Sequence, residues 1–270
     1  MTEVTFGIPL MSRRVARNWG SIENLLAATL RSVFNQNDAS IRVIIACHER
    51  PEIVEAHDAR VTIKQVEFDI PRFRAEMELD RMRKLEVIGS ELRANGGGWL
   101  FVLDADDFVS KHLAKTILAS PVKALVVRRG YRLDAKLGQY QQLGKLWGKC
   151  GSCAAVRWDE SELPLKPLSD NPPIYHEFCE RRHYLLPSFF ASRGWSWRFL
   201  EAPLVVYVVN HGSNQSVVIV RDTIKWRLYF KLMPWKPWKS ELDEEFGVNP
   251  EKRTEGIYIG DKLFSTEFRQ

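Results

Sequence analysis

Residues 96–107 read GGGWLFVLDADD, and this stretch shows how the first part of the chain is organised. The three glycines predict the end of a charged helix over Arg74–Asn95, because glycine tolerates the left-handed backbone that terminates helices. The apolar run Trp99–Leu103 then predicts a buried strand that leads directly into Asp104-Ala105-Asp106-Asp107. In open α/β sheets ligands bind beyond the carboxyl ends of strands, so these acids are candidates for a ligand site.

The residues before this stretch alternate between strand and helix patterns. Apolar runs predict strands at Val4–Leu10, Ile41–Cys47 and Val61–Phe68. Apolar residues at three- and four-residue spacing from Ile22 to Phe34 predict a helix with one buried face, capped by Ser21. The resulting order over residues 1–110 is β-α-β-β-α-β, which is typical of an α/β domain.

Beyond Asp107 the expected order becomes mixed. The patterns predict a helix at Lys111–Leu118, a strand at Ala124–Arg128, a hairpin over Tyr131–Leu143, a strand at Cys153–Trp158, a helix at Tyr175–Leu186 stopped by Pro187, and a strand at Leu204–Val209. We therefore expect an α/β fold with a Rossmann-like mixed β-sheet flanked by helices. Residues 1–216 would form this domain, in halves 1–110 and 111–216, and residues 217–270 a helical, aromatic and basic C-terminal extension.

Composition excludes some classes of protein and leaves others open. With 45% hydrophobic and 27% charged residues, the chain is not mainly disordered. The net charge of +5 is compatible with a phosphate-bearing ligand, an acidic membrane surface or nucleic acid, and it selects none of them. The first residues, MTEVTFGIPL, lack the pattern of a signal peptide, and no apolar run has the length of a membrane span. We expect a cytoplasmic protein, or one lying on the cytoplasmic face of a membrane.

The Asp-x-Asp spacing of Asp104 and Asp106 has a direct chemical interpretation. Two hard oxygen ligands can hold Mg²⁺ or Mn²⁺ and leave coordination positions open for diphosphate oxygens. Such an ion neutralises the charge that develops on a departing diphosphate. The alternative is a solvated turn in which an aspartate caps the next helix.

Several segments, in the same order, resemble the GT-A glycosyltransferases and above all their broad family-2-like group. The matching segments are Gly7-Ile8-Pro9, LLAATLRSVFNQ at 25–36, LDADD at 103–107, Arg193-Gly194 and His211-Gly212-Ser213. The resemblance covers residues 4–216 and implies a GT-A-like fold, with a nucleotide-sugar-binding half at 1–110 and an acceptor half at 111–216. It also implies a metal-dependent, inverting hexosyltransferase of the kind used in polysaccharide biosynthesis. Such an enzyme moves a sugar from a nucleotide-diphosphate sugar to a hydroxyl of a glycan, lipid-linked or small-molecule acceptor.

The resemblance assigns roles to individual residues. Asp104, Asp106 and His211 would be the ligands of Mn²⁺ or Mg²⁺, with Asp104 also near the nucleotide ribose. Pro9 would lie in the nucleotide-binding loop, and Lys84 near the nucleotide. For His211, a loop histidine without a metal remains the alternative.

Two departures from the family pattern leave roles open. Where the family has an acid that reads the nucleobase, this chain has Cys47–Pro51, and only Glu49 offers a carboxylate. The Glu-Asp pair that carries the general base of inverting members is replaced by Arg182-His183. A histidine can deprotonate a hydroxyl, so His183 is one candidate base, and the upstream acids Asp170, Glu177 and Glu180 are others. Without a base, a retaining mechanism or an inactive protein follows.

The cysteines, the tryptophans and the C-terminal region give weaker signals. Cys150, Cys153, Cys179 and His183 could close a zinc site, or the cysteines could be small buried hydrophobes. Four of the nine tryptophans, at 147, 158, 195 and 197, lie where indole rings could stack on an acceptor sugar. Residues 225–239 interleave cations with aromatics, which suits either contact with anionic membrane headgroups or a helix packed on the core. No motif supports nucleic-acid binding.

Two other functions remain open. The missing Glu-Asp pair is compatible with a relative that binds a nucleotide or glycan without turnover. A sugar nucleotidyltransferase would need a glycine-rich, arginine-bearing loop after the first strand, and PLMSRRVARNWG at 9–20 has the arginines but only one late glycine.

Overall fold

The structure is a computed structural model, and it describes residues 3–37, 40–169, 172–211 and 234–248. In this part of the chain seven strands form the larger sheet, in the order β10-β6-β9-β4-β1-β2-β3. Their bounds are β1 Glu3–Pro9, β2 Ser40–Cys47, β3 Val61–Gln65, β4 Gly98–Val102, β6 Ala124–Val127, β9 Ala154–Trp158 and β10 Trp197–Leu200. β9 runs antiparallel to both of its neighbours, and the other pairings are parallel. The expected mixed, Rossmann-like sheet is confirmed.

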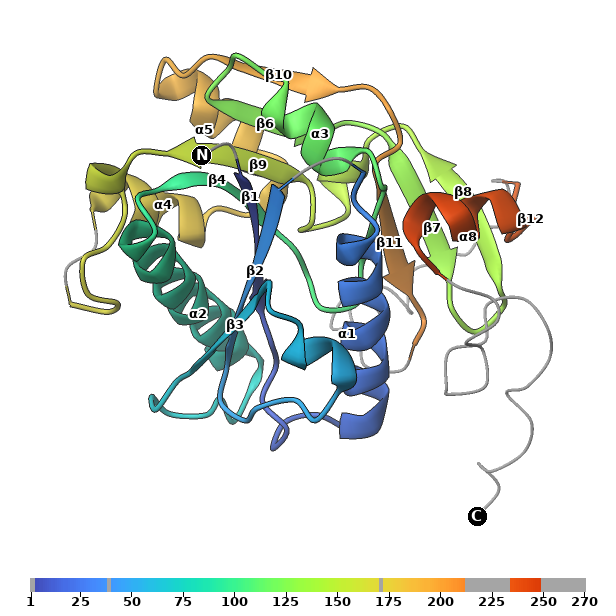
Figure 1. The fold of residues 1–270 in the computed structure, drawn as a ribbon, viewed down its shortest axis with the longest axis horizontal. Helices are drawn as coiled ribbons and strands as arrows, with labels where there is room; N and C mark the ends of the chain where they lie inside the picture. The colour runs from blue at the N-terminus through green and yellow to red at the C-terminus, as the bar shows by residue number, and fades with distance from the viewer. Residues whose placement is uncertain (1–2, 38–39, 170–171, 212–233, 249–270) are drawn as a thin grey trace.

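Helices cover both faces of this sheet (Figure 1). α1 (Trp19–Phe34) and α3 (Leu113–Leu118) pack on one face. α2 (Arg74–Ala94), α4 (Pro173–Glu180) and α5 (Leu186–Ser192) pack on the other. The alternation of side chains along β2 shows why both faces need cover: Val43 and Ile45 join the α1 side of the core, whereas Ile44 and Ala46 join the α2 side.

A smaller sheet lies beside the first, in the order β12-β8-β7-β11-β5. Its strands are β5 Phe108–Val109, β7 Gly130–Asp134, β8 Gln139–Leu143, β11 Val205–Val209 and β12 Lys236–Pro237. β7 and β8 form the hairpin expected from the sequence. Short 3-10 helices occupy Val54–His57 (η1), Leu146–Gly148 (η2), Glu160–Glu162 (η3) and His183–Leu185 (η4).

Part of the C-terminal extension packs on the domain. β12 pairs with β8, and α8 (Ser240–Phe246) follows it. Phe246 is fully buried, and its ring meets those of Tyr131 and Trp238 edge-on or tilted. For Trp238 the structure therefore agrees with the interpretation of core packing. Residues 225–233 of the basic, aromatic stretch lie outside the described residues, so membrane contact through 225–239 stays a prediction.

The helix expected over Tyr175–Leu186 is in fact broken. α4 ends at Glu180, and Arg181 and Arg182 have extended backbones, with ψ of 129° and 138°. Pro187 does not end a helix but lies in the first turn of α5, where its missing N–H costs no hydrogen bond. A proline cannot continue a preceding helix, because its ring clashes with the carbonyl four residues earlier. The break puts residues 181–183 at the edge of a cleft.

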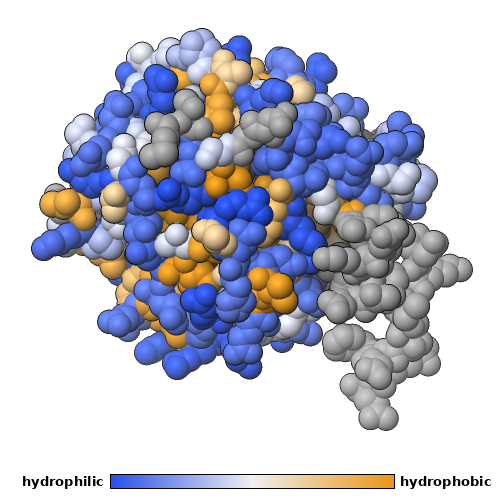
Figure 2. Space-filling model, in the orientation of Figure 1, coloured by the Kyte–Doolittle hydropathy of each residue, from blue (hydrophilic) through white to orange (hydrophobic). Residues whose placement is uncertain are grey.

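Figure 2 shows a mostly hydrophilic face with small, scattered hydrophobic patches. In the described residues, no helix combines the length and the apolar character that crossing a bilayer requires.

Candidate functional site

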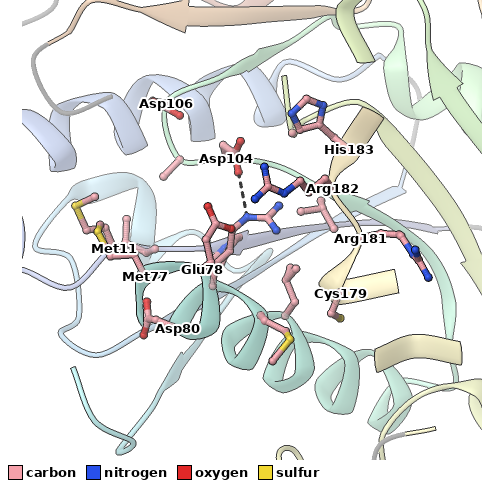
Figure 3. A pocket seen from close by; sticks show the side chains of 18 of the residues that line it. Met11, Met77, Glu78, Asp80, Asp104, Asp106, Cys179, Arg181, Arg182 and His183 are labelled. Carbon is pink, nitrogen blue, oxygen red and sulfur yellow. Dashed lines mark ion pairs between the residues drawn. The ribbon is translucent and has the colours of Figure 1, made fainter. Parts of the chain in front are cut away.

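A cleft of about 680 Å³ opens beyond the carboxyl ends of β1 and β4. Its walls come from the loop after β1, from α1 and α2, from the acids after β4, from the break between α4 and α5, and from the segment after β11. Figure 3 shows Asp104 and Asp106 facing Arg182 and His183 across the centre of the cleft. Its polar and charged lining residues include Glu78, Asp80, Arg81, Asp104, Asp106, Lys149, Glu180, Arg181, Arg182, His183, Tyr207 and His211.

Asp104 is held by its neighbours on both sides. Its backbone N–H donates to Ser152 Oγ at 2.9 Å, and Arg81 Nε lies 3.9 Å from its Oδ1. A Cβ at Gly151 would stand 2.7 Å from Asp104 Oδ2, so only glycine leaves room for this carboxylate. Burial raises the pKa of Asp104; the charge of Arg81 lowers it, and that of Asp106 raises it further.

Asp106 meets a residue from far along the chain. His211 Nε2 lies 2.7 Å from Asp106 Oδ2, a contact that joins positions 105 residues apart. Just before His211, Asn210 has a φ of 63°, and its Nδ2 donates to both oxygens of Asp134 at 3.2 Å. This left-handed residue turns the chain at the end of β11, since asparagine tolerates that conformation. The proximity of Asp106 and His211 agrees with the resemblance, while their roles stay predictions.

Asp107 has a structural function. Its carboxylate is fully buried and accepts hydrogen bonds from Ser152 Oγ (2.6 Å), Cys150 Sγ (3.1 Å) and Val208 N (3.0 Å). Burial raises the pKa of Asp107 well above its ordinary value, and the charges of Asp106 and Asp104 raise it further. Asp107 therefore ties the end of β4 to the segment before β9 and to β11.

The acids fit an ion that is shared with a ligand. In the ranges that the structure describes, no group of three or more His, Cys, Asp or Glu side chains is arranged to hold a metal ion. Asp104, Asp106 and His211 nevertheless offer two carboxylates and an imidazole on one side of the cleft. Mg²⁺ is usually bound through one or two carboxylates together with substrate phosphates. The donor set thus fits Mg²⁺ or Mn²⁺ completed by phosphate oxygens, rather than a cage made of protein alone.

The cysteines behave as buried hydrophobes. Cys47, Cys150, Cys153 and Cys179 are all free and buried. Burial raises the pKa of Cys47 to about 11 and raises those of the other three thiols as well. Among the residues that the structure describes, these cysteines and His183 do not come together in a group of three or more that could hold a metal ion. The arrangement therefore agrees with the hydrophobe interpretation and not with the zinc site.

His183 is oriented by a backbone carbonyl. Its Nδ1 lies 2.6 Å from Trp147 O. Because a carbonyl only accepts, Nδ1 carries the proton and donates, which leaves Nε2 of the neutral ring as a base. His183 lies on the cleft wall opposite Asp104 and Asp106 (Figure 3).

The other candidate bases have different surroundings. Glu180 lines the cleft, and its Oε1 lies 3.4 Å from His176 Nε2. Glu177 forms ion pairs with Arg181 and Arg193 and is absent from the cleft lining. Asp170 lies outside the described residues.

Lys84 supports the cleft from behind. It is fully buried, and its Nζ donates to Leu10 O at 2.8 Å and to Asp80 Oδ2 at 2.7 Å. The other oxygen of Asp80 accepts from His48 Nε2 at 2.8 Å. Burial lowers the pKa of Lys84, and the charge of Asp80 opposes this shift. Lys84 thus anchors the start of the loop after β1, next to Pro9, the last residue of β1, which lines the cleft.

Glu49 holds the same loop from the other side. Its two oxygens accept from Ser12 Oγ at 3.0 Å and from Arg13 N at 2.9 Å. It is not among the residues that line the cleft. Its contact with the nucleobase stays a prediction, and its observed contacts hold the loop after β1 in place.

Sequence reasoning missed several lining residues and misplaced some aromatic ones. Arg81, Lys149, Arg181 and Arg182 give no motif, and only the fold brings them to the cleft. The expected stacking surface of Trp147, Trp158, Trp195 and Trp197 is wrong. In the described part of the chain these rings are absent from the cleft lining and pack with the core on the α2 side, where Trp158 contacts Phe178 of α4 and Trp195 contacts Phe189 of α5.

Comparisons with known proteins identify no family for this chain. No family model matches the chain, and no curated protein matches it. A solved structure of 4-diphosphocytidyl-2C-methyl-D-erythritol synthase from Anaerococcus prevotii is 14% identical with a TM-score of 0.38, over 85% of this chain and 96% of that one. A structure of CMP:2-keto-3-deoxy-manno-octonic acid synthetase in complex with CTP is 9% identical with a TM-score of 0.37, over 86% of this chain and 99% of that one. The resemblance to family-2-like glycosyltransferases is not confirmed by these comparisons.

Proposed function

We propose that this chain is a nucleotide-dependent transferase that moves a sugar from a nucleotide-diphosphate sugar to an acceptor hydroxyl. The observation that carries the proposal is the pairing of two sets of groups across one cleft. Asp104, Asp106 and His211 stand on one side, and His183 with an oriented, basic Nε2 stands on the other. The first set suits a diphosphate with its ion, and the second suits a hydroxyl that must lose a proton.

In this reaction His183 would act as the general base. The acceptor hydroxyl gives its proton to Nε2 while its oxygen forms a bond to the anomeric carbon of the donor. The bond from that carbon to the diphosphate breaks, and the diphosphate leaves with the electron pair. The Trp147 carbonyl keeps the proton on Nδ1, which leaves Nε2 to take the proton of the acceptor hydroxyl.

The acids would act at the diphosphate. Asp104 and Asp106, with His211, would hold Mn²⁺ or Mg²⁺, whose charge stabilises the negative charge that develops on the leaving diphosphate. Lys84 and Glu49 would position the loop after β1, against which the nucleotide lies. Attack from the His183 side, opposite the leaving group, gives inversion.

A second candidate is nucleotidyl transfer, in which a sugar phosphate attacks a nucleoside triphosphate and pyrophosphate leaves. Exposed Arg13 and Arg14 in the loop after β1 favour it, because cations there suit a triphosphate. The names of the two solved structures agree with this candidate better than with sugar transfer. Their TM-scores of 0.38 and 0.37 make that likeness too weak to choose the reaction.

The two reactions release different products. The protein is incubated with Mn²⁺ and either nucleotide-diphosphate sugars plus an acceptor panel, or nucleoside triphosphates plus sugar 1-phosphates. We expect release of a nucleoside diphosphate in the first mixture and no pyrophosphate in the second, with EDTA abolishing the release. Pyrophosphate formed only with the sugar 1-phosphate would establish nucleotidyl transfer instead. Nucleotide binding without either product would favour a binding protein without turnover.

A further inference from the structure

We propose that the acceptor is an anionic saccharide and that Arg182 binds its phosphate or carboxylate group beside His183. The inference rests on the proposed function and names the substrate class on the acceptor side of the same cleft. Three observations support it. The break between α4 and α5 directs Arg182 into the cleft, other cations in this part of the molecule already form ion pairs, and the aromatic ring of Tyr184 lies next to His183.

The break gives consecutive side chains different directions. Because Arg181 and Arg182 both have extended backbones, their side chains point to opposite sides. Figure 3 shows the guanidinium of Arg182 directed toward the centre of the cleft and that of Arg181 directed away from it. Arg182 also immediately precedes His183, so a ligand within reach of the base is within reach of this guanidinium.

Three other cations in this part of the molecule form ion pairs with carboxylates. Arg81 lies 3.9 Å from Asp104, and Lys84 lies 2.7 Å from Asp80. Arg181 lies 3.6 Å from Glu177.

Arg182 differs from these cations. Over the ranges that the structure describes, no carboxylate oxygen lies within 4.0 Å of its guanidinium. A guanidinium binds a carboxylate or phosphate through two parallel hydrogen bonds, and such charge-assisted bonds are stronger than neutral ones. An anion on the ligand would therefore supply the partner that the protein does not provide.

The next residue favours a sugar as the body of this ligand. The side chain of Tyr184 is 45% exposed and lines the cleft, and its ring meets that of His183 edge-on at 5.7 Å. An exposed aromatic ring offers an apolar face to a sugar, while the adjacent cation suits the charged group. Arg182, His183 and Tyr184 together would thus contact the anion, the reacting hydroxyl and the ring of one acceptor.

Binding measurements with matched ligands and variants test this assignment. Glucose 6-phosphate and glucose are each titrated by calorimetry into the full chain. One series contains Mn²⁺ and one of several nucleoside diphosphates, and a second series contains the protein alone. The variants are Arg182→Gln and Arg181→Gln, both at exposed positions, with melting temperatures checked against the wild type. We expect the wild type and Arg181→Gln to bind glucose 6-phosphate in preference to glucose, and Arg182→Gln to bind it about tenfold more weakly.

Each other result has a defined meaning. Equal affinity of Arg182→Gln and the wild type for glucose 6-phosphate would overturn the proposal, as would a wild type that binds neither glucose 6-phosphate nor inorganic phosphate. If Arg182→Gln instead loses nucleoside diphosphate affinity, Arg182 serves the donor and the acceptor assignment is wrong. If no nucleotide binds but glucose 6-phosphate binding still depends on Arg182, the proposed function fails while the anion site stands.

Discussion

Asp106 and Asp107 are adjacent in the chain, but their carboxylates have opposite surroundings. The side chain of Asp106 is 27% exposed in the cleft and meets His211, whereas Asp107 is fully buried among three hydrogen-bond donors. The sequence places both at the end of a predicted strand and does not separate them. The separation arises from residues far away, Ser152 and Val208, whose donors become known only once β9 and β11 are in position.

Substitution of the two acids is expected to separate activity from stability. Asp106→Asn should leave the free energy of unfolding within about 1 kcal/mol of the wild type and reduce sugar transfer roughly a hundredfold or more. Asp107→Ala should cost about 3 kcal/mol, because it leaves the buried Ser152 hydroxyl and Val208 N–H without their acceptor. Urea unfolding and the product-release assay measure the two effects. A stable, inactive Asp107→Ala variant beside a fully active Asp106→Asn variant would reverse the assignment.

A substitution at Gly151 tests whether activity depends on the position of the Asp104 carboxylate. In Gly151→Ala the new methyl group would stand 2.7 Å from Asp104 Oδ2, and the flexible carboxylate should turn away before the backbone moves. We expect a folded protein with a nearly unchanged melting temperature and a transfer rate reduced about tenfold or more, since displaced catalytic groups lose their preorganisation. Gly148→Ala is the control, because a Cβ there meets nothing within 4 Å. Equal activity of the two variants would show that the position of Asp104 is unimportant.

At the scale of secondary-structure elements, the hydrophobic pattern of the sequence predicted the strands that are buried in the core. β1, β2, β4 and β11 lie within a residue or two of the expected strands, because continuous apolar runs suit strands buried on both faces. Features set by tertiary contacts were missed. β10 completes the sheet through Trp197–Leu200, which has no clear alternation of its own.

The ends of the helices also depend on local contacts that the hydrophobic pattern does not show. α1 begins at Trp19, and Asn18, not Ser21, is its N-cap: the Asn18 side chain accepts from the N–H of Ser21. The break after α4, which positions Arg182 and His183, was predicted as continuous helix. The acids of the site could thus be found from the sequence, whereas most of the opposite wall could not.

The turn between α2 and β4 gives a test at this scale. Gly96 and Gly97 both have positive φ, 86° and 77°, so alanine is strained at either position. A Cβ at Gly97 would also stand 2.7 Å from the backbone oxygen of Trp158, whereas one at Gly96 meets nothing within 4 Å. We expect Gly96→Ala to cost about 1 kcal/mol and Gly97→Ala about 3 kcal/mol, by urea unfolding. Equal costs would mean that the approach of β9 to this turn does not constrain it.

At the scale of the whole molecule, the C-terminal segment joins regions that are distant in sequence. α8 lies against the end of α1, where Asn35 Nδ2 donates to Glu244 O at 3.0 Å and Lys111 Nζ pairs with Glu244 at 2.9 Å. Phe246 extends the core of the smaller sheet. Residues 234–248 of the expected C-terminal extension therefore pack on the domain.

Phe246→Ala tests whether this segment stabilises the domain. Deleting a fully buried phenyl ring should cost about 3 kcal/mol in the free energy of unfolding. Leu137→Ala, at a side chain that is 62% exposed, is the control and should cost less than about 0.5 kcal/mol. Similar stability of the two variants would show that α8 contributes little to the fold.

The most direct test of the proposed site is a calorimetric titration of nucleoside diphosphates into the wild type and Asp106→Asn, each with Mn²⁺ and with EDTA. We expect one nucleoside diphosphate to bind the wild type with Mn²⁺, and both EDTA and the substitution to weaken that binding at least about tenfold. A thermal-shift measurement should agree, since a ligand at about 100 times its dissociation constant adds ~2.7 kcal/mol to stability. Binding that is equally tight in EDTA and in Asp106→Asn, or no binding of any nucleoside diphosphate, would contradict the assignment of this cleft.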